Sequence, residues 1–255
     1  MKRKDRPSGQ RSGKAAWWQN NEVGRFLNAA LLDPVPRNHR ESDQAFRRRR
    51  VVVAITLVCG AVLLGISLNL EPGDRRFYGL TLLLAAVWTV GSLLSGPLHL
   101  GWARTRGQGQ ARPVVQPITL GLFAVAIACA IALAVGQIPP LREQVNSVLD
   151  FARYSSLPLV ALITLVNGLS EELFFRGALY AAIGERFPVL WTTALYAATT
   201  AVAGNPMLVF AAVVLGLLVG LQRRVTGGIL GPMLTHVIWS LSMLFILPPL
   251  IGTVG

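Results

Sequence analysis

Charged residues are scarce in this chain, and acidic residues are the scarcest of them. Only 14% of its 255 residues are charged, with 12 Asp and Glu against 24 Lys and Arg, whereas a soluble domain carries about 25%. Hydrophobic residues make up 53% of the chain, and its mean hydropathy is +0.51. This composition excludes an ordinary soluble domain and indicates a membrane protein.

Cysteine is almost absent too. The two cysteines, Cys59 and Cys129, both fall within apolar stretches. They support neither a disulfide framework nor a metal cluster, so we interpret them as packing residues. The first apolar run begins only at Val51, after a long basic segment, and further runs follow it. We therefore expect an uncleaved first helix rather than a cleaved signal peptide.

Long apolar runs are the feature that the chain does have. Stretches near the ~20 residues that a helix needs to cross a bilayer recur about seven times. They predict an all-α fold, a polytopic transmembrane bundle of about seven spans, whose fifth and sixth members are short and are expected to be tilted or sheltered by neighbours. The expected spans are 51–70, 77–95, 118–135, 156–183, 188–203, 207–221 and 229–247.

The placement of charge predicts an orientation. Residues 1–50 hold 13 of the 24 Lys and Arg but only five acids, which puts this tail in the cytoplasm by the positive-inside rule. With seven spans, the C-terminus then lies outside, and we expect a multi-pass protein of the plasma (inner) membrane. We divide the chain into a basic cytoplasmic tail (1–50), N-terminal transmembrane helices (51–150) and core helices (151–255).

The basic tail has no recognisable nucleic-acid-binding module, so we expect it to contact anionic lipid head groups and no nucleic acid. Asn21 is expected to cap a short amphipathic helix that ends near Asp33. Its apolar side would carry Val23, Phe26, Leu27, Ala30 and Leu31. We expect the rest of residues 1–46 to be disordered.

Three charges interrupt the fourth span. Glu171, Glu172 and Arg176 lie in the stretch NGLSEELFFRGALY, and His236 is the one histidine well inside a span. Ionisable groups at this depth cost about 2.5 to 3.5 kcal/mol each, so by default they mark a functional site. Glu172 and Arg176 are four residues apart, a favourable spacing for an ion pair, whereas Glu171 is rotated about 100° away.

Two interpretations of these charges remain open. The three groups can form one buried polar knot that fixes helix packing, which we favour for Glu172 and Arg176. Glu171 has no partner at helical spacing, so we favour a chemical role for it as a base that takes a proton from water.

Depth places further polar residues at a similar level. Measured from the cytoplasmic ends of their spans, Glu171 and Thr200 lie ~18 Å deep and His236 ~14 Å deep at 1.5 Å per residue. Ser240 is one turn beyond His236. Together they predict a polar cluster, although a satisfied interhelical histidine and a helix–helix hydrogen bond from Thr200 are the structural alternatives.

The charged motif resembles a known family. Glu171-Glu172-x-x-x-Arg176 is similar to the first motif of the CAAX protease and bacteriocin-processing (CPBP) family of intramembrane endopeptidases. Gly228-x-x-x-Pro232-x-x-x-His236 resembles the stretch that leads to the last motif of that family. The resemblance covers residues 156–245.

The resemblance implies a role for each motif residue. Glu171 would activate the attacking water, Glu172 with Arg176 would hold the site together, and His236 would act in catalysis or stabilise the oxyanion. No cofactor is firmly implied, and zinc enters only by analogy with the family.

Two positions depart from the family pattern. An aromatic residue followed by histidine appears here as Tyr196-x-x-x-Thr200, and the last-motif asparagine appears as Ser240. A hydroxyl can bond a water or an oxyanion, but Thr200 cannot act as a base.

The leading hypothesis is an intramembrane glutamate-type endopeptidase that cleaves a peptide or protein substrate presented from the cytoplasmic side. The alternative is a catalytically silent relative that acts as a binding or scaffold protein. A proton-coupled transporter is weaker, because the sequence shows no internal repeat or matching pair of broken helices.

Overall fold

The computed structural model describes residues 21–105, 109–153 and 156–252. Apart from one short hairpin, the regular structure of these residues is helical, which confirms the expected all-α fold. The elements are α2 (Glu22–Leu27), π-helix η1 (Asn28–Leu32), α3 (Asp43–Leu68), α4 (Arg76–Ser95), β1 (Ala103–Arg104), β2 (Gln110–Ala111), α5 (Val115–Val135), α6 (Pro139–Arg153), α7 (Leu157–Glu172), π-helix η2 (Leu173–Leu179), α8 (Tyr180–Ile183), α9 (Pro188–Ala201), α10 (Pro206–Thr226) and α11 (Leu230–Gly252).

Six segments of the described chain are long and apolar enough to cross a membrane. They coincide with six of the seven expected spans, and α7, η2 and α8 together form the fourth, Leu157–Ile183. The remaining expected span is α9, which has 14 residues and so reaches only about 21 Å at 1.5 Å per residue. It packs against α10 and α3, in line with the expectation that a short span is sheltered by its neighbours. The sixth expected span was wrongly expected to be short, because α10 continues past residue 221 to Thr226 and has 21 residues.

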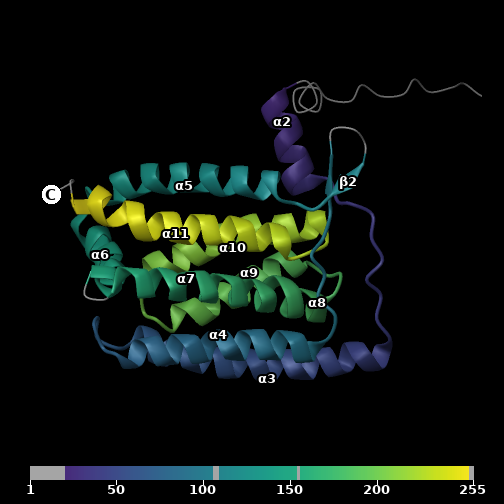
Figure 1. Ribbon diagram of the computed structural model, residues 1–255, viewed down its shortest axis with the longest axis horizontal. Helices are drawn as coiled ribbons and strands as arrows, with labels where there is room; N and C mark the ends of the chain where they lie inside the picture. Colours follow the sequence, from purple (N-terminus) through teal and green to yellow (C-terminus); the bar gives the residue numbers. More distant parts are fainter. Residues whose placement is uncertain (1–20, 106–108, 154–155, 253–255) are drawn as a thin grey trace, which may run out of the picture.

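The helices pair into layers with α7 near the centre. α3 pairs with α4, α5 pairs with α11, and α7 contacts both α4 and α11. Figure 1 shows α5 and α11 along one side of the bundle and α3 and α4 along the opposite side, with α7, α9 and α10 between them. The charged motif on α7 is therefore surrounded by protein rather than by lipid.

The two ends of the bundle differ. α6 and the end of α11 lie at one end, and α2 and the hairpin lie at the other (Figure 1). The second end also receives the start of α3, the end of α10 and their arginines, so we call it the basic end; it includes Arg48, Arg104, Arg112, Arg186 and Arg224. This gathering is consistent with the positive-inside argument, while the side of the membrane that each end faces stays a prediction.

The N-terminal segment is better ordered than the sequence suggests. As expected, the Asn21 side chain caps α2 by accepting a hydrogen bond from Val23 N at 3.0 Å. Contrary to the expectation of disorder up to residue 46, the chain then docks on α10, where Val35 N donates to Val225 O at 2.9 Å. Ala30 and Val35 are only 3% exposed, and their burial explains the order. Residues 1–20 lie outside the described residues.

Small residues allow α3 and α4 to approach closely. Gly60 of α3 faces the Trp88 ring of α4 so closely that an added Cβ would lie 2.1 Å from a ring carbon. Helices in membranes associate chiefly through such van der Waals contacts, because lipid is as apolar as the side chains. Trp88 is 1% exposed and stacks on Phe174 at 4.3 Å between ring centroids, so the α3–α4 pair supports the wall behind the charged motif.

We expect Gly60→Ala to lower the free energy of unfolding by about 1 to 3 kcal/mol, the usual cost of overpacking. Gly79→Ala is the matched control, since nothing lies within 4 Å of a Cβ added there on α4. Thermal unfolding of both variants in detergent measures the difference. Equal midpoints would show that the α3–α4 contact is looser than described.

Candidate active site

Glu172, Arg176 and His236 form a buried charged group. Glu172 Oε1 accepts a hydrogen bond from Arg176 Nη1 at 3.0 Å and lies 2.7 Å from His236 Nδ1. Glu172 and Arg176 are fully buried, and His236 is 5% exposed. A carboxylate only accepts hydrogen bonds, so Nδ1 donates its proton to Glu172 and the other ring nitrogen of the histidine faces elsewhere.

That other nitrogen faces Glu171. His236 Nε2 lies 3.9 Å from Glu171 Oε2, too far for a direct hydrogen bond. The same carboxylate oxygen accepts a hydrogen bond from the Tyr196 hydroxyl of α9 at 2.8 Å. Glu171 keeps 16% of its side chain exposed, so the two adjacent glutamates have distinct surroundings, one sealed and one accessible.

The helix changes form directly after the glutamates. α7 ends at Glu172, and π-helix η2 carries Phe174, Phe175 and Arg176 before α8 resumes the α-helical form. Single turns of π-helix are rare and often occur at functional sites. The stretch is supported from α10, because the buried Arg223 donates from Nε to the Arg176 carbonyl at 2.6 Å.

Aromatic rings enclose the guanidinium of Arg176. Its central carbon lies 4.9 Å from the Tyr196 ring centroid and 5.9 Å from that of Phe175. A cation is attracted to the face of an aromatic ring, and more strongly where water is excluded. Tyr196 therefore contacts both halves of the site, Arg176 through its ring and Glu171 through its hydroxyl.

Thr200 and Ser240 stand apart from the carboxylates. The Thr200 hydroxyl donates to the Tyr196 carbonyl of its own helix at 2.9 Å, and Ser240 is half-buried on α11, four residues after His236. Among the described residues, no hydrogen bond joins either side chain to Glu171, Glu172 or His236. The structure thus brings four of the six sequence-derived candidates into one cluster.

A divalent metal does not fit this donor set. No group of three or more His, Cys, Asp and Glu in the described parts of the chain is arranged to hold a metal ion. Glu172 Oε1 is bonded by Arg176 and by His236 Nδ1, which leaves Glu171 and His236 Nε2 as donors, whereas catalytic zinc takes three protein ligands. No step of the chemistry below is routed through a metal.

The segment that carries the site matches the model of a known family. Residues 153–242 match the model of the type II CAAX prenyl endopeptidase Rce1-like family. This segment, which we call the Rce1-like domain, is similar to that family. It contains all six candidate residues and confirms the resemblance of the motifs to CAAX proteases, while no curated protein and no solved structure matches the chain.

Sequence reasoning missed two residues of the Rce1-like domain. Tyr196 was recognised only as the aromatic position of a motif, although its hydroxyl bonds Glu171. Arg223 falls beyond the expected span 207–221, but α10 continues to Thr226 and buries Arg223 to 5% exposure. The available signal was an arginine at the end of an apolar run, but such an arginine is equally typical of an exposed residue that flanks a span.

Replacing Arg176 with Ala should leave Glu172 buried with His236 as its remaining partner. Breaking a buried ion pair costs about 3 to 5 kcal/mol, so we expect a large drop in the thermal midpoint in detergent. Arg76→Ala is the control, because it breaks the ion pair with Asp74 at an exposed position and should leave the midpoint unchanged. An unchanged midpoint for Arg176→Ala would contradict a structural role for that pair.

Proposed function

We propose that the Rce1-like domain is an intramembrane endopeptidase in which Glu171 activates water. The observation that carries the proposal is the pairing of a partly exposed carboxylate with His236 Nε2 at 3.9 Å, beside a second carboxylate that is fully buried. The match to an endopeptidase family supports the reaction class, and the geometry supports the residue assignment.

The water would lie between Glu171 and His236. A molecule at about 2.8 Å from both Glu171 and Nε2 has ordinary hydrogen-bond lengths and is held beside an accessible oxygen. As it attacks the peptide carbonyl, its proton passes to the Glu171 carboxylate, which later returns a proton to the leaving amine. The Tyr196 hydroxyl donates to Oε2 of the same carboxylate and holds the carboxylate in place, so Tyr196 is a positioning residue.

Glu172 and Arg176 would act through His236. The hydrogen bond from Nδ1 to Glu172 fixes the ring orientation and the tautomer, so Nε2 is the acceptor that would hold the water. The Ser240 hydroxyl, one turn beyond His236 on α11, is the donor available to the oxyanion. The Thr200 hydroxyl donates to the Tyr196 carbonyl within α9, so we assign it no step in the reaction.

A silent relative is the second candidate function, and one observation favours it. The family position that carries histidine on α9 is Thr200 here, and its hydroxyl is already used within its own helix. A binding protein of the membrane needs the folded bundle but no turnover, so activity separates the two candidates.

The substrate is proposed to be a peptide or protein segment that enters from the cytoplasmic side of the plasma membrane. The basic end would face the cytoplasm, which places the N-terminus inside and the C-terminus outside. Anionic head groups of that leaflet would be the neighbours of its arginines.

Glu171→Gln should abolish turnover and leave the fold intact. Glutamine keeps the shape and the hydrogen bond from Tyr196 but cannot take the proton of water, and loss of a general base costs about 10² to 10⁴ in rate. Purified parent and variant are compared for peptide cleavage in liposomes, with thermal unfolding as the check on folding.

Two further variants sharpen that assay. Tyr196→Phe should reduce the rate less than Glu171→Gln, because it removes one hydrogen bond and no proton acceptor. Thr200→His should raise activity if the hydroxyl marks a weakened site. A folded parent that cleaves no peptide, with and without these substitutions, would overturn the endopeptidase in favour of the silent relative.

Orientation is tested by labelling single cysteines from one side of the membrane. In a parent whose Cys59 and Cys129 are replaced by Ser, Arg75→Cys should react with an impermeant maleimide added to intact cells, whereas Arg186→Cys should react only after permeabilisation. The reverse pattern would place the basic end outside.

A further inference from the structure

A second site lies at the basic end, away from the carboxylates. A cavity of about 350 Å³ opens between the segment before α3, the α4–β1 connection and the end of α10. It falls within the size range of small-ligand sites. Its walls include the side chains of Arg37, His39, His99, Trp102 and Arg112.

Glycines shape the floor of the cavity. Gly101 and Gly228 approach so closely that a Cβ on Gly228 would lie 2.0 Å from Gly101 N. The contact is fastened by hydrogen bonds from Trp102 N to Thr226 O and from Ile229 N to His99 O, both 2.9 Å. The cavity is therefore part of the fold and is held by backbone contacts.

The cavity is strongly positive. Arg112 lies over the Trp102 ring at 4.0 Å and donates to Gly101 O, while Arg37 donates to Val225 O at 3.4 Å. None of the described residues that line it is a carboxylate. Among the described residues the nearby acids are taken, since Asp33 pairs with Arg104 and Glu41 pairs with Arg49.

Two histidines, His39 and His99, line the cavity beside these arginines. Their rings stack at 3.7 Å, and the pKa of His39 is lowered to about 4 by burial first and then by His99, Arg223 and Arg37. Burial also lowers the pKa of His99, with Arg223 and Arg49 acting in the same direction and Glu41 opposing them. The arginines act on both histidines in the same direction as burial, which agrees with the positive charge that the geometry gives this cavity.

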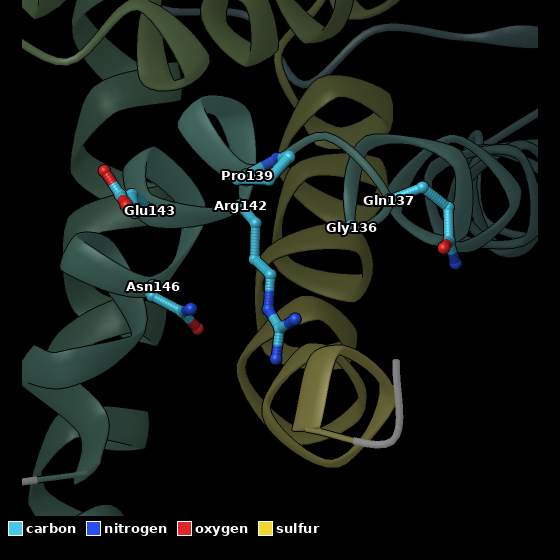
Figure 2. A pocket seen from close by; sticks show the side chains of 6 residues that line it. All are labelled: Gly136, Gln137, Pro139, Arg142, Glu143 and Asn146. Carbon is cyan, nitrogen blue, oxygen red and sulfur yellow. The ribbon is translucent and has the colours of Figure 1, made fainter. Parts of the chain in front are cut away.

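Exposed apolar side chains surround the positive charge. Trp102 and Leu100 are 44% and 48% exposed beside the cavity, and Leu32 of η1, the helix that contacts β1, is 51% exposed. Tryptophan next to basic residues at the end of membrane spans is typical of the head-group region, and a free inorganic ion would gain nothing from these apolar groups. The other cavity of similar size, at the α6 end, lacks this character, because Arg142 and Glu143 both line it and leave α6 in different directions (Figure 2).

We propose that this cavity binds the phosphate of an anionic phospholipid from the leaflet at the basic end, with Arg37 and Arg112 as the phosphate ligands and Trp102 and Leu100 against the glycerol and acyl chains. Arginine holds phosphate through charge-assisted hydrogen bonds, and basic pockets at the ends of membrane helices are suited to lipid head groups. The inference is independent of the peptidase activity.

The test is a binding titration of the purified full chain in neutral detergent. The probes are dihexanoylphosphatidylglycerol, dihexanoylphosphatidylcholine and inorganic phosphate. We expect dihexanoylphosphatidylglycerol to bind at least tenfold more tightly than dihexanoylphosphatidylcholine or inorganic phosphate. Each of Arg37→Gln and Arg112→Gln should weaken it about tenfold, the value of one charge-assisted hydrogen bond.

Matched variants separate binding from folding. Arg75→Gln and Arg142→Gln, made singly, each remove the same charge at the opposite end and should leave the affinity unchanged. Arg37→Lys and Arg112→Lys keep the charge and should retain most of the binding, even where the glutamine variants lose thermal stability. Equal affinity for the choline lipid, equal affinity for inorganic phosphate, or an equal loss in either opposite-end control would each overturn the lipid site.

Discussion

The buried carboxylate of Glu172 is the constraint on which the rest of the core depends. A charge taken out of water must be matched by partners of good geometry, or it costs several kcal/mol. Here the match comes from Arg176 one turn along the same segment and from His236 on α11. Because one partner is local and the other is 64 residues away in the chain, satisfying this single charge also fixes how α7 and α11 meet.

That requirement explains much of the packing around α7. The guanidinium needs a dry, polarisable wall, which Phe175 and Tyr196 supply. The Phe175 ring contacts Tyr196 on one side and Trp88 of the α3–α4 pair on another. Arg223 holds the carbonyl of Arg176 from behind. An accessible Glu171 beside this rigid group gains a fixed position without having to provide the structural charge itself, which is the arrangement that its proposed role as a general base requires.

The basic end is joined to the same core through small residues. Leu98, which lines the positive cavity, would lie 3.0 Å from a Cβ added at Gly177 of η2, one residue after Arg176. A single packed side chain, that of Leu98, therefore lies between the cavity and the π-helix. The N-terminal segment docked on α10 completes this end, since Arg37 reaches over Gly227, whose positive φ of 68° allows the turn into α11.

Much of this arrangement follows from the sequence alone. Apolar runs of near-membrane length predict the helices, the spacing of Glu172 and Arg176 predicts their ion pair, and depth along the spans places Glu171 and His236 at one level. These features depend on local periodicity and on the free-energy cost of burying charge in lipid. Both can be assessed from the order of residues along the chain. The tertiary structure decided which carboxylate the histidine bonds. The rotation of α11 relative to α7 determines whether His236 Nδ1 meets Glu171 or Glu172. The tertiary structure also decided the bond from Tyr196 to Glu171, the π-helix, the buried Arg223 and the cavity, since each requires contacts between segments that are far apart in sequence and whose relative positions no local pattern encodes.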